Sequence, residues 1–176
     1  MATEQDRMLQ VLKLAIQMEI DGKAFYLQAS QQSSNSMGKE LLKSLAAEED
    51  RHKQTFTEIY EAIRHKKAWP RVDLPPDRDK ILRTIFARAS ASDSTTAKPE
   101  GSELDAVQTA IEMEVKSYSL YADEGKNARY DTEREFYEKL AGEERQHHLI
   151  LLDYYEYLKD PAQWFTSKEH SSLDGG

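Results

Sequence analysis

Apolar residues recur at intervals of three and four positions in four long stretches of the chain, a spacing typical of helices that bury one face. The pattern predicts helices over residues 3–33, 37–66, about 103–128 and about 131–159. Thr3 with Asp6 predicts a capped start for the first helix, and Asp160 followed by Pro161 predicts the end of the last. No stretch alternates as a strand does, so we expect an all-α protein.

The lengths of the connections predict how these helices are arranged. The first two helices and the last two are joined by short turns, which favours two antiparallel hairpins. Between them, a connection over about 67–102 can run back along the bundle and carry a short helix near 77–90. We therefore expect an antiparallel four-helix bundle with one long crossover between helices two and three. The bundle would occupy residues 1–168, followed by a flexible tail at 169–176.

The two predicted hairpins resemble each other in sequence. A shift of 95 residues aligns the chain with itself without a gap from Leu9 to Tyr60. Residues 15–19 (AIQME) then lie over 110–114 (AIEME), and residues 45–52 (LAAEEDRH) lie over 140–147 (LAGEERQH). A pseudo-two-fold axis should therefore relate the hairpins, and a residue near that axis should have its counterpart nearby.

Six ionisable residues lie within the apolar stripes of the four helices. In each hairpin a Glu stands three residues before a His, which places both on one helix face, and a second Glu lies 30 residues earlier. One Glu from each of two helices and Glu-x-x-His from each of the other two is the pattern of ferritin-like dinuclear iron or manganese sites. The six residues are Glu19, Glu49, His52, Glu114, Glu144 and His147.

Electrostatics supports a metal site. Four carboxylates and two imidazoles in one core would repel and be poorly solvated, whereas two divalent cations would neutralise the four carboxylates. This donor set suits iron, and manganese or zinc is possible. Tyr26 and Tyr121, seven residues after Glu19 and Glu114, either hydrogen-bond the ligand carboxylates or are core tyrosines whose hydroxyls are satisfied elsewhere.

Composition excludes several other functions. The formal net charge of −8 argues against nucleic-acid binding, and no run is long and apolar enough to cross a membrane. The absence of Cys excludes disulfides, iron–sulfur centres and Cys-bound zinc. We expect a cytoplasmic protein. Glu48 and Glu143, which precede the Glu of each Glu-x-x-His pair, point about 100° away, so we expect them in ion pairs.

Over about residues 5–160 these motifs resemble the rubrerythrin-type diiron proteins of the ferritin-like superfamily. The resemblance implies two iron ions per chain, each completed by one Glu and one His, with two further Glu bridging them. Glu49 and Glu144 would be the bridges, Glu19 with His52 would complete one ion, and Glu114 with His147 the other.

The chain departs from the rubrerythrin pattern in two respects. Full rubrerythrins carry a rubredoxin domain with four iron-binding Cys, whereas this sequence has none, so we expect an external electron donor. Rubrerythrins also carry a further Glu three residues after the third-helix ligand, and here that position is Ser117, with Gly22 as its repeat counterpart. These small residues could leave room for a small molecule or for waters. The resemblance also implies a homodimer.

The sequence favours a dinuclear iron protein that reacts with hydrogen peroxide or dioxygen. Two alternatives stay open. One is a ferroxidase or iron-handling protein, in which iron itself is the substrate. The other is a non-catalytic helical bundle stabilised by metal. Steady turnover with peroxide would favour the first interpretation, net iron uptake the second, and an inert zinc site the third.

Overall fold

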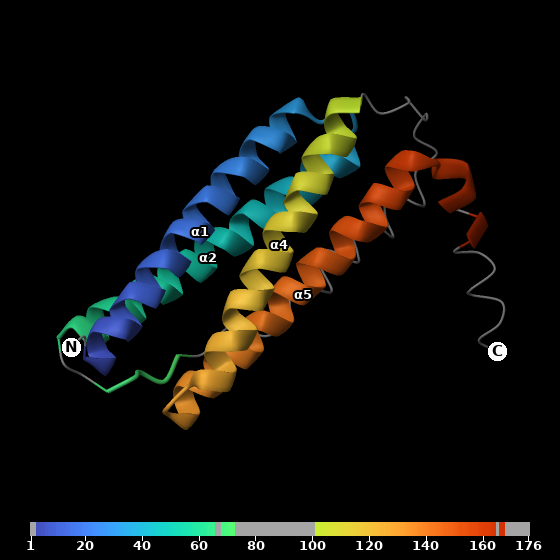
Figure 1. The fold of residues 1–176 in the computed structure, drawn as a ribbon. Coiled ribbons are helices and arrows are strands. Elements are labelled where there is room, and N and C mark those ends of the chain that lie inside the picture. Colours follow the sequence, from blue (N-terminus) through green and yellow to red (C-terminus); the bar gives the residue numbers. More distant parts are fainter. Residues whose placement is uncertain (1–2, 66–67, 73–100, 165, 168–176) are drawn as a thin grey trace.

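The computed structural model describes residues 3–65, 68–72, 101–164 and 166–167, which contain four long helices (Figure 1). They are α1 (Glu4–Gln32), α2 (Ser36–Arg64), α4 (Gly101–Asn127) and α5 (Asp131–Lys159). Each end lies within two residues of its predicted position, and the described residues contain no strand. The prediction of an all-α four-helix bundle is confirmed.

Local hydrogen bonds account for where the helices begin and end. At the start of α1, Thr3 Oγ1 accepts from the Asp6 N–H (3.1 Å), while an Asp6 carboxylate oxygen accepts from the Thr3 N–H (2.8 Å). At the start of α2, Asn35 Oδ1 accepts from the Gly38 N–H (2.6 Å). Helix α5 stops at Asp160, before Pro161. These caps satisfy backbone donors that no helical carbonyl can reach.

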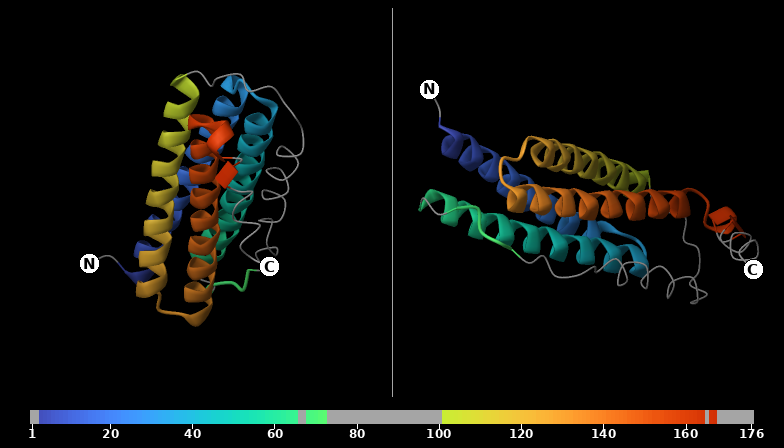
Figure 2. Two further views of the ribbon diagram at one scale, coloured as in Figure 1. Left: turned by 90° about the vertical axis from the view of Figure 1, so that its right-hand side faces the viewer. Right: turned by 90° about the horizontal axis from the view of Figure 1, so that it is seen from below.

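The four helices form two antiparallel hairpins, α1 with α2 and α4 with α5, and α1 also runs beside α4 (Figures 1 and 2). The backbones lie closer within each hairpin than between the hairpins, so side chains fill much of the space between the two pairs. Most of the predicted crossover, the short helix predicted at 77–90 and the predicted tail at 169–176 lie outside the described residues.

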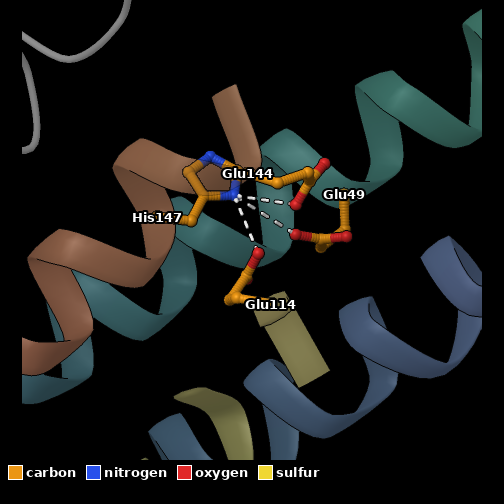
Figure 3. Close-up of side chains that lie close together, drawn as sticks. All are labelled: Glu49, Glu114, Glu144 and His147. Carbon is orange, nitrogen blue, oxygen red and sulfur yellow. Dashed lines mark ion pairs between the residues drawn. The ribbon is translucent and has the colours of Figure 1, made fainter. Parts of the chain in front are cut away.

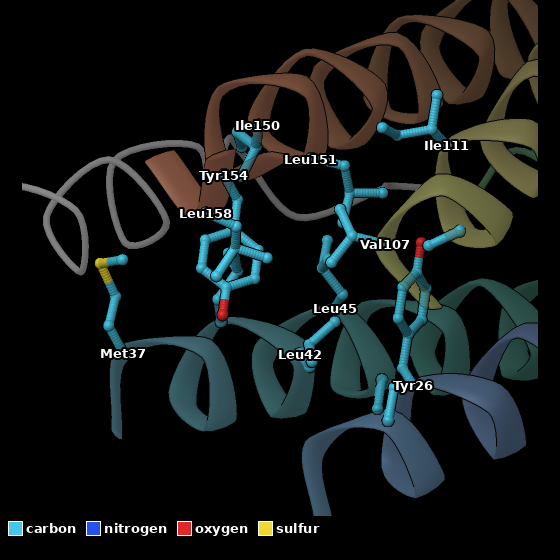
Figure 4. Close-up of a cluster of buried hydrophobic side chains, with 14 of the residues drawn as sticks. Tyr26, Met37, Leu42, Leu45, Val107, Ile111, Ile150, Leu151, Tyr154 and Leu158 are labelled. Carbon is cyan, nitrogen blue, oxygen red and sulfur yellow. The ribbon is translucent and has the colours of Figure 1, made fainter. Parts of the chain in front are cut away.

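Two apolar clusters fill the two ends of the bundle. One contains Tyr26, Leu45, Leu151 and Tyr154, among others (Figure 4). The other, at the opposite end, contains Phe56 among others.

Each cluster includes a tryptophan, Trp164 at one end and Trp69 at the other. On every helix, residues of the two clusters lie on either side of the predicted metal ligands. The ligands therefore form a polar layer between two apolar ones.

Among the described helices, none combines the length and the apolar character needed to cross a membrane.

Candidate metal centre

The polar layer at the middle of the bundle brings all six predicted ligands together. Helix α1 supplies Glu19 and α4 supplies Glu114, while α2 and α5 each supply one Glu-x-x-His pair. None of the six exposes more than 4% of its surface. A solvated helix face is therefore excluded as the reason for these charged residues within the apolar stripes.

Three carboxylates from three helices face the Nδ1 atom of His147 (Figure 3). Its Nδ1 lies 3.6 Å from Glu49 Oε1, 3.7 Å from Glu114 Oε2 and 3.6 Å from Glu144 Oε2. By residue type and spacing, these four residues could together hold a metal ion.

The ring of His52, which stacks on the ring of His147 with the centroids 5.7 Å apart, has a similar environment. Its Nδ1 lies 3.0 Å from Glu144 Oε1 and 3.4 Å from Glu19 Oε2. Glu19, Glu49 and His52 form a second group able to hold an ion. Glu49 belongs to both groups, and Glu144 directs one oxygen toward each histidine. These two residues therefore lie where a carboxylate shared by two ions would lie.

Unpartnered buried atoms test whether the layer suits a metal. One atom of each of the six residues is buried and has no hydrogen-bond partner. Such groups are costly in a protein interior, and a bound cation removes the cost. Carboxylate oxygens and imidazole nitrogens are suitable donors for first-row divalent metals. The six atoms are Glu19 Oε2, Glu49 Oε1, His52 Nδ1, Glu114 Oε2, Glu144 Oε1 and His147 Nδ1.

Two buried tyrosines contact this layer from opposite ends of the bundle. The Tyr26 hydroxyl donates to Glu114 Oε1, and the Tyr121 hydroxyl donates to Glu19 Oε1. Each tyrosine thus bonds the Glu of the opposite hairpin. The sequence repeat that relates the two hairpins also relates these two contacts to each other. Each also engages the outer oxygen, so Oε2 of Glu114 and of Glu19 is left to face the centre.

Crowded carboxylates raise pKa values in the metal-free layer. Burial, together with the charges of Glu19 and Glu144, holds the pKa of Glu49 well above its ordinary value. Burial and the charge of Glu144 raise the pKa of Glu114 to about 8. Without metal, these two carboxyl groups therefore keep protons near neutral pH.

The pKa shifts of Glu144 and of the two histidines favour their charged forms. Burial alone would raise the pKa of Glu144, but the positive charges of the facing His52 and His147 lower it well below its ordinary value. Burial would lower the pKa of His52 and His147, but the facing carboxylates raise both well above theirs. Protons thus take the place of cations when metal is absent.

Glu48 and Glu143 form the ion pairs that the sequence predicts, through Arg51. Arg51 Nη2 donates to Glu48 Oε2 (2.5 Å) on its own helix and to Glu143 Oε2 (2.6 Å) on α5. Sequence reasoning missed a further contact: His52 Nε2 lies 2.9 Å from the same Glu143 oxygen. The only sequence signal for it was the place of Glu143 next to Glu144.

The space predicted beside Gly22 is already occupied. A Cβ atom at this position would lie 3.1 Å from Glu49 Oε2, so the carboxylate of Glu49 packs directly against the glycine. The hypothesis of a free site for a small molecule therefore does not apply there. Its repeat counterpart, Ser117, is half-buried.

Comparison with known proteins identifies one family. The family model described as Rubrerythrin matches residues 10–155, a span that includes all six residues of the layer. No curated protein and no solved structure matches the chain.

Proposed function

The chain belongs to the rubrerythrin family, and from this premise we propose that it is a dinuclear non-haem iron protein that reacts with hydrogen peroxide or dioxygen. The observation that carries the proposal is the set of six buried, unpartnered donor atoms in one layer. Four carboxylates balance the charge of two divalent cations, and the two histidines supply one nitrogen to each.

The residues divide between the two ions according to their contacts. In this proposal Glu49 and Glu144 would be the ligands that both ions share, since Glu49 belongs to both ligand groups and Glu144 directs one oxygen toward each histidine. Glu19 with His52 would complete one ion, and Glu114 with His147 would complete the other. Tyr26 and Tyr121 hold the outer oxygens of the two unshared carboxylates and so keep their inner oxygens directed at the ions.

When bound as ferrous ions, the two metals supply the two electrons that convert hydrogen peroxide and two protons into two water molecules. The chain's own part is to position ligands and limit the access of bulk water, because apolar clusters cover both sides of the layer. In this proposal a reductase or a rubredoxin would return the electrons to the iron.

Iron handling is the second candidate, and Ser117 favours it. This half-buried residue lies one turn from Glu114, at the position where the rubrerythrin pattern has a Glu. Without that carboxylate, the layer has one fewer ligand to hold iron through a redox cycle. Ferrous iron would then be the substrate, oxidised to the ferric state by dioxygen or peroxide and passed on.

Elemental analysis followed by stopped-flow absorbance tests the proposal. Protein purified without oxygen should contain close to two iron ions per chain, and its absorbance should change rapidly after mixing with peroxide or dioxygen. Repeated turnover with an electron donor supports the peroxide or dioxygen reaction, whereas net uptake of iron supports iron handling. A site that holds only zinc and reacts with neither oxidant would overturn both.

A further inference from the structure

We propose that Glu143 and Arg51 position His52, and that this makes the two metal positions unequal: the ion held by Glu19 and His52 binds more tightly than the ion held by Glu114 and His147. The inference rests on the proposed function only in requiring that the layer binds two divalent ions.

The contact between Glu143 and His52 determines which ring nitrogen can bind metal. Glu143 Oε2 lies 2.9 Å from His52 Nε2, and a carboxylate can only accept a hydrogen bond, so Nε2 carries the proton. In the neutral ring, the lone pair is then on Nδ1, the atom that faces Glu19 and Glu144. A histidine held in this way by a carboxylate is a more basic and better oriented metal ligand.

Arg51 holds Glu143 in place. Its Nη2 donates to the same Glu143 oxygen (2.6 Å), while its Nε donates to Glu48 Oε2 (2.9 Å). The three side chains are largely buried, with 18%, 20% and 6% exposure for Arg51, Glu143 and Glu48. By residue type, Glu48, His52 and Glu143 could form a third metal group. The guanidinium already supplies the positive charge there, so this group acts as a support for His52.

The other half of the layer lacks the same arrangement. The sequence repeat aligns Gln146 with Arg51, and Glu48 with Glu143. Gln146 is neutral, and Glu48 is bonded to Arg51. Among the described residues, every carboxylate that lies within ion-pair distance of His147 faces its Nδ1 atom. Figure 3 shows the second ring nitrogen of His147 pointing away from them.

Anaerobic titration with Co²⁺, followed by visible absorption, tests the inequality. The parent should bind two ions in two steps. Arg51→Gln gives α2 the residue that α5 has at the matching position of the repeat. It should weaken the affinity of the tighter step about 10-fold to 100-fold, so that the two binding steps merge. Glu143→Gln removes the charged acceptor that His52 Nε2 contacts and should weaken the same step at least as much. Gln146→Ala, the matched change on α5, should leave both steps unchanged.

Two histidine backgrounds separate positioning from a general structural effect. In His147→Ala, the remaining ion is the one held by His52, and adding Arg51→Gln should weaken it. In His52→Ala, adding Arg51→Gln should leave the remaining ion unaffected. Equal weakening in both backgrounds, or no weakening in either, would overturn the inference, as would a parent that binds two equal ions or none. A parent with two unequal Co²⁺ ions but no oxidant reactivity when iron-loaded would refute the proposed function alone.

Discussion

The two hairpins supply the same ligands but surround them differently. The sequence repeat aligns every Glu and His of the layer with an identical residue of the other hairpin. It also aligns the two tyrosines with each other. The neighbouring positions do not match: Gly22 pairs with Ser117, and Arg51 pairs with Gln146. The first hairpin is packed tightly around its ligands, with Glu49 against Gly22 and Arg51 across to Glu143.

This difference separates two requirements of a buried metal layer. The two cations of the proposed site would need a full donor set, so neither half could lose its Glu or His. Groups next to the ligands act only on orientation and access, so they can differ between the halves and make them unequal. Variants that touch the shared ligands should therefore affect both halves, while variants at unmatched positions should affect one.

The largest effect is expected from the two shared carboxylates. Glu49→Ala or Glu144→Ala should weaken both ions, because each residue faces both histidines or belongs to both ligand groups. His52→Ala and His147→Ala should each weaken mainly one ion. Metal content per chain after anaerobic gel filtration measures the difference. Glu135→Ala, an exposed position on α5, is the control, and loss of only one ion from Glu144→Ala would contradict the shared role.

Metal-free protein should lose stability as the pH rises from 5 to 8. The raised pKa values of Glu49 and of Glu114, at about 8, mean that the folded state holds protons that the unfolded chain releases. The raised pKa values of His52 and His147 act in the same direction above about pH 6.5. Each proton that the folded state holds and the unfolded chain does not lowers the free energy of unfolding by about 1.4 kcal/mol for every unit by which the pH rises.

Denaturant unfolding of chelator-treated protein at pH 5, 6.5 and 8 measures this slope. Bound metal should remove most of it, because the cations replace the protons. Glu114→Gln should reduce the slope of the metal-free protein, since its amide does not titrate. Equal stability of the metal-free parent across this range would count against a clustered carboxylate layer.

The tyrosine contacts predict a crossed effect between the halves. Tyr26→Phe should weaken the ion held by Glu114, and Tyr121→Phe the ion held by Glu19, because each hydroxyl bonds the opposite hairpin. A hydrogen bond to a charged group contributes about 1.5–3 kcal/mol, so each change should weaken its ion by about tenfold or more. Co²⁺ titration in the two histidine backgrounds assigns the affected ion. Weakening of the ion on the same hairpin would show the crossed pairing to be wrong.

The smallest effect is expected at Ser117. Ser117→Glu places a carboxylate one turn from Glu114 and should raise reactivity with peroxide relative to dioxygen by about tenfold, or about 1.4 kcal/mol of barrier. Stopped-flow rates with both oxidants measure this ratio, and Ser117→Ala is the matched control. At Gly22, an added Cβ would lie 3.1 Å from Glu49 Oε2, so a Glu at that position would displace the carboxylate of Glu49. A parent that already reduces peroxide quickly, with an unchanged variant, would remove the argument for iron handling.

The sequence by itself determined the four helices and the positions of the ligands along them. Helical periodicity is a local property, so the stripes and caps, such as Thr3 with Asp6, could be read directly. The repeat supplied the rest, because Glu-x-x-His at matching places in two hairpins predicts that the pairs meet. The structure brings all six residues into one layer.

The tertiary structure decided which groups surround that layer. Periodicity placed Tyr26 and Glu19 on one face, but α1 lies beside α4, and the hydroxyl reaches Glu114 instead. The buried Glu103 is a second example. It accepts hydrogen bonds from Ser33 Oγ (2.6 Å) and from the Tyr154 hydroxyl (2.8 Å). These partners are distant in sequence, and their pairing depends on how the hairpins pack, which no local pattern encodes.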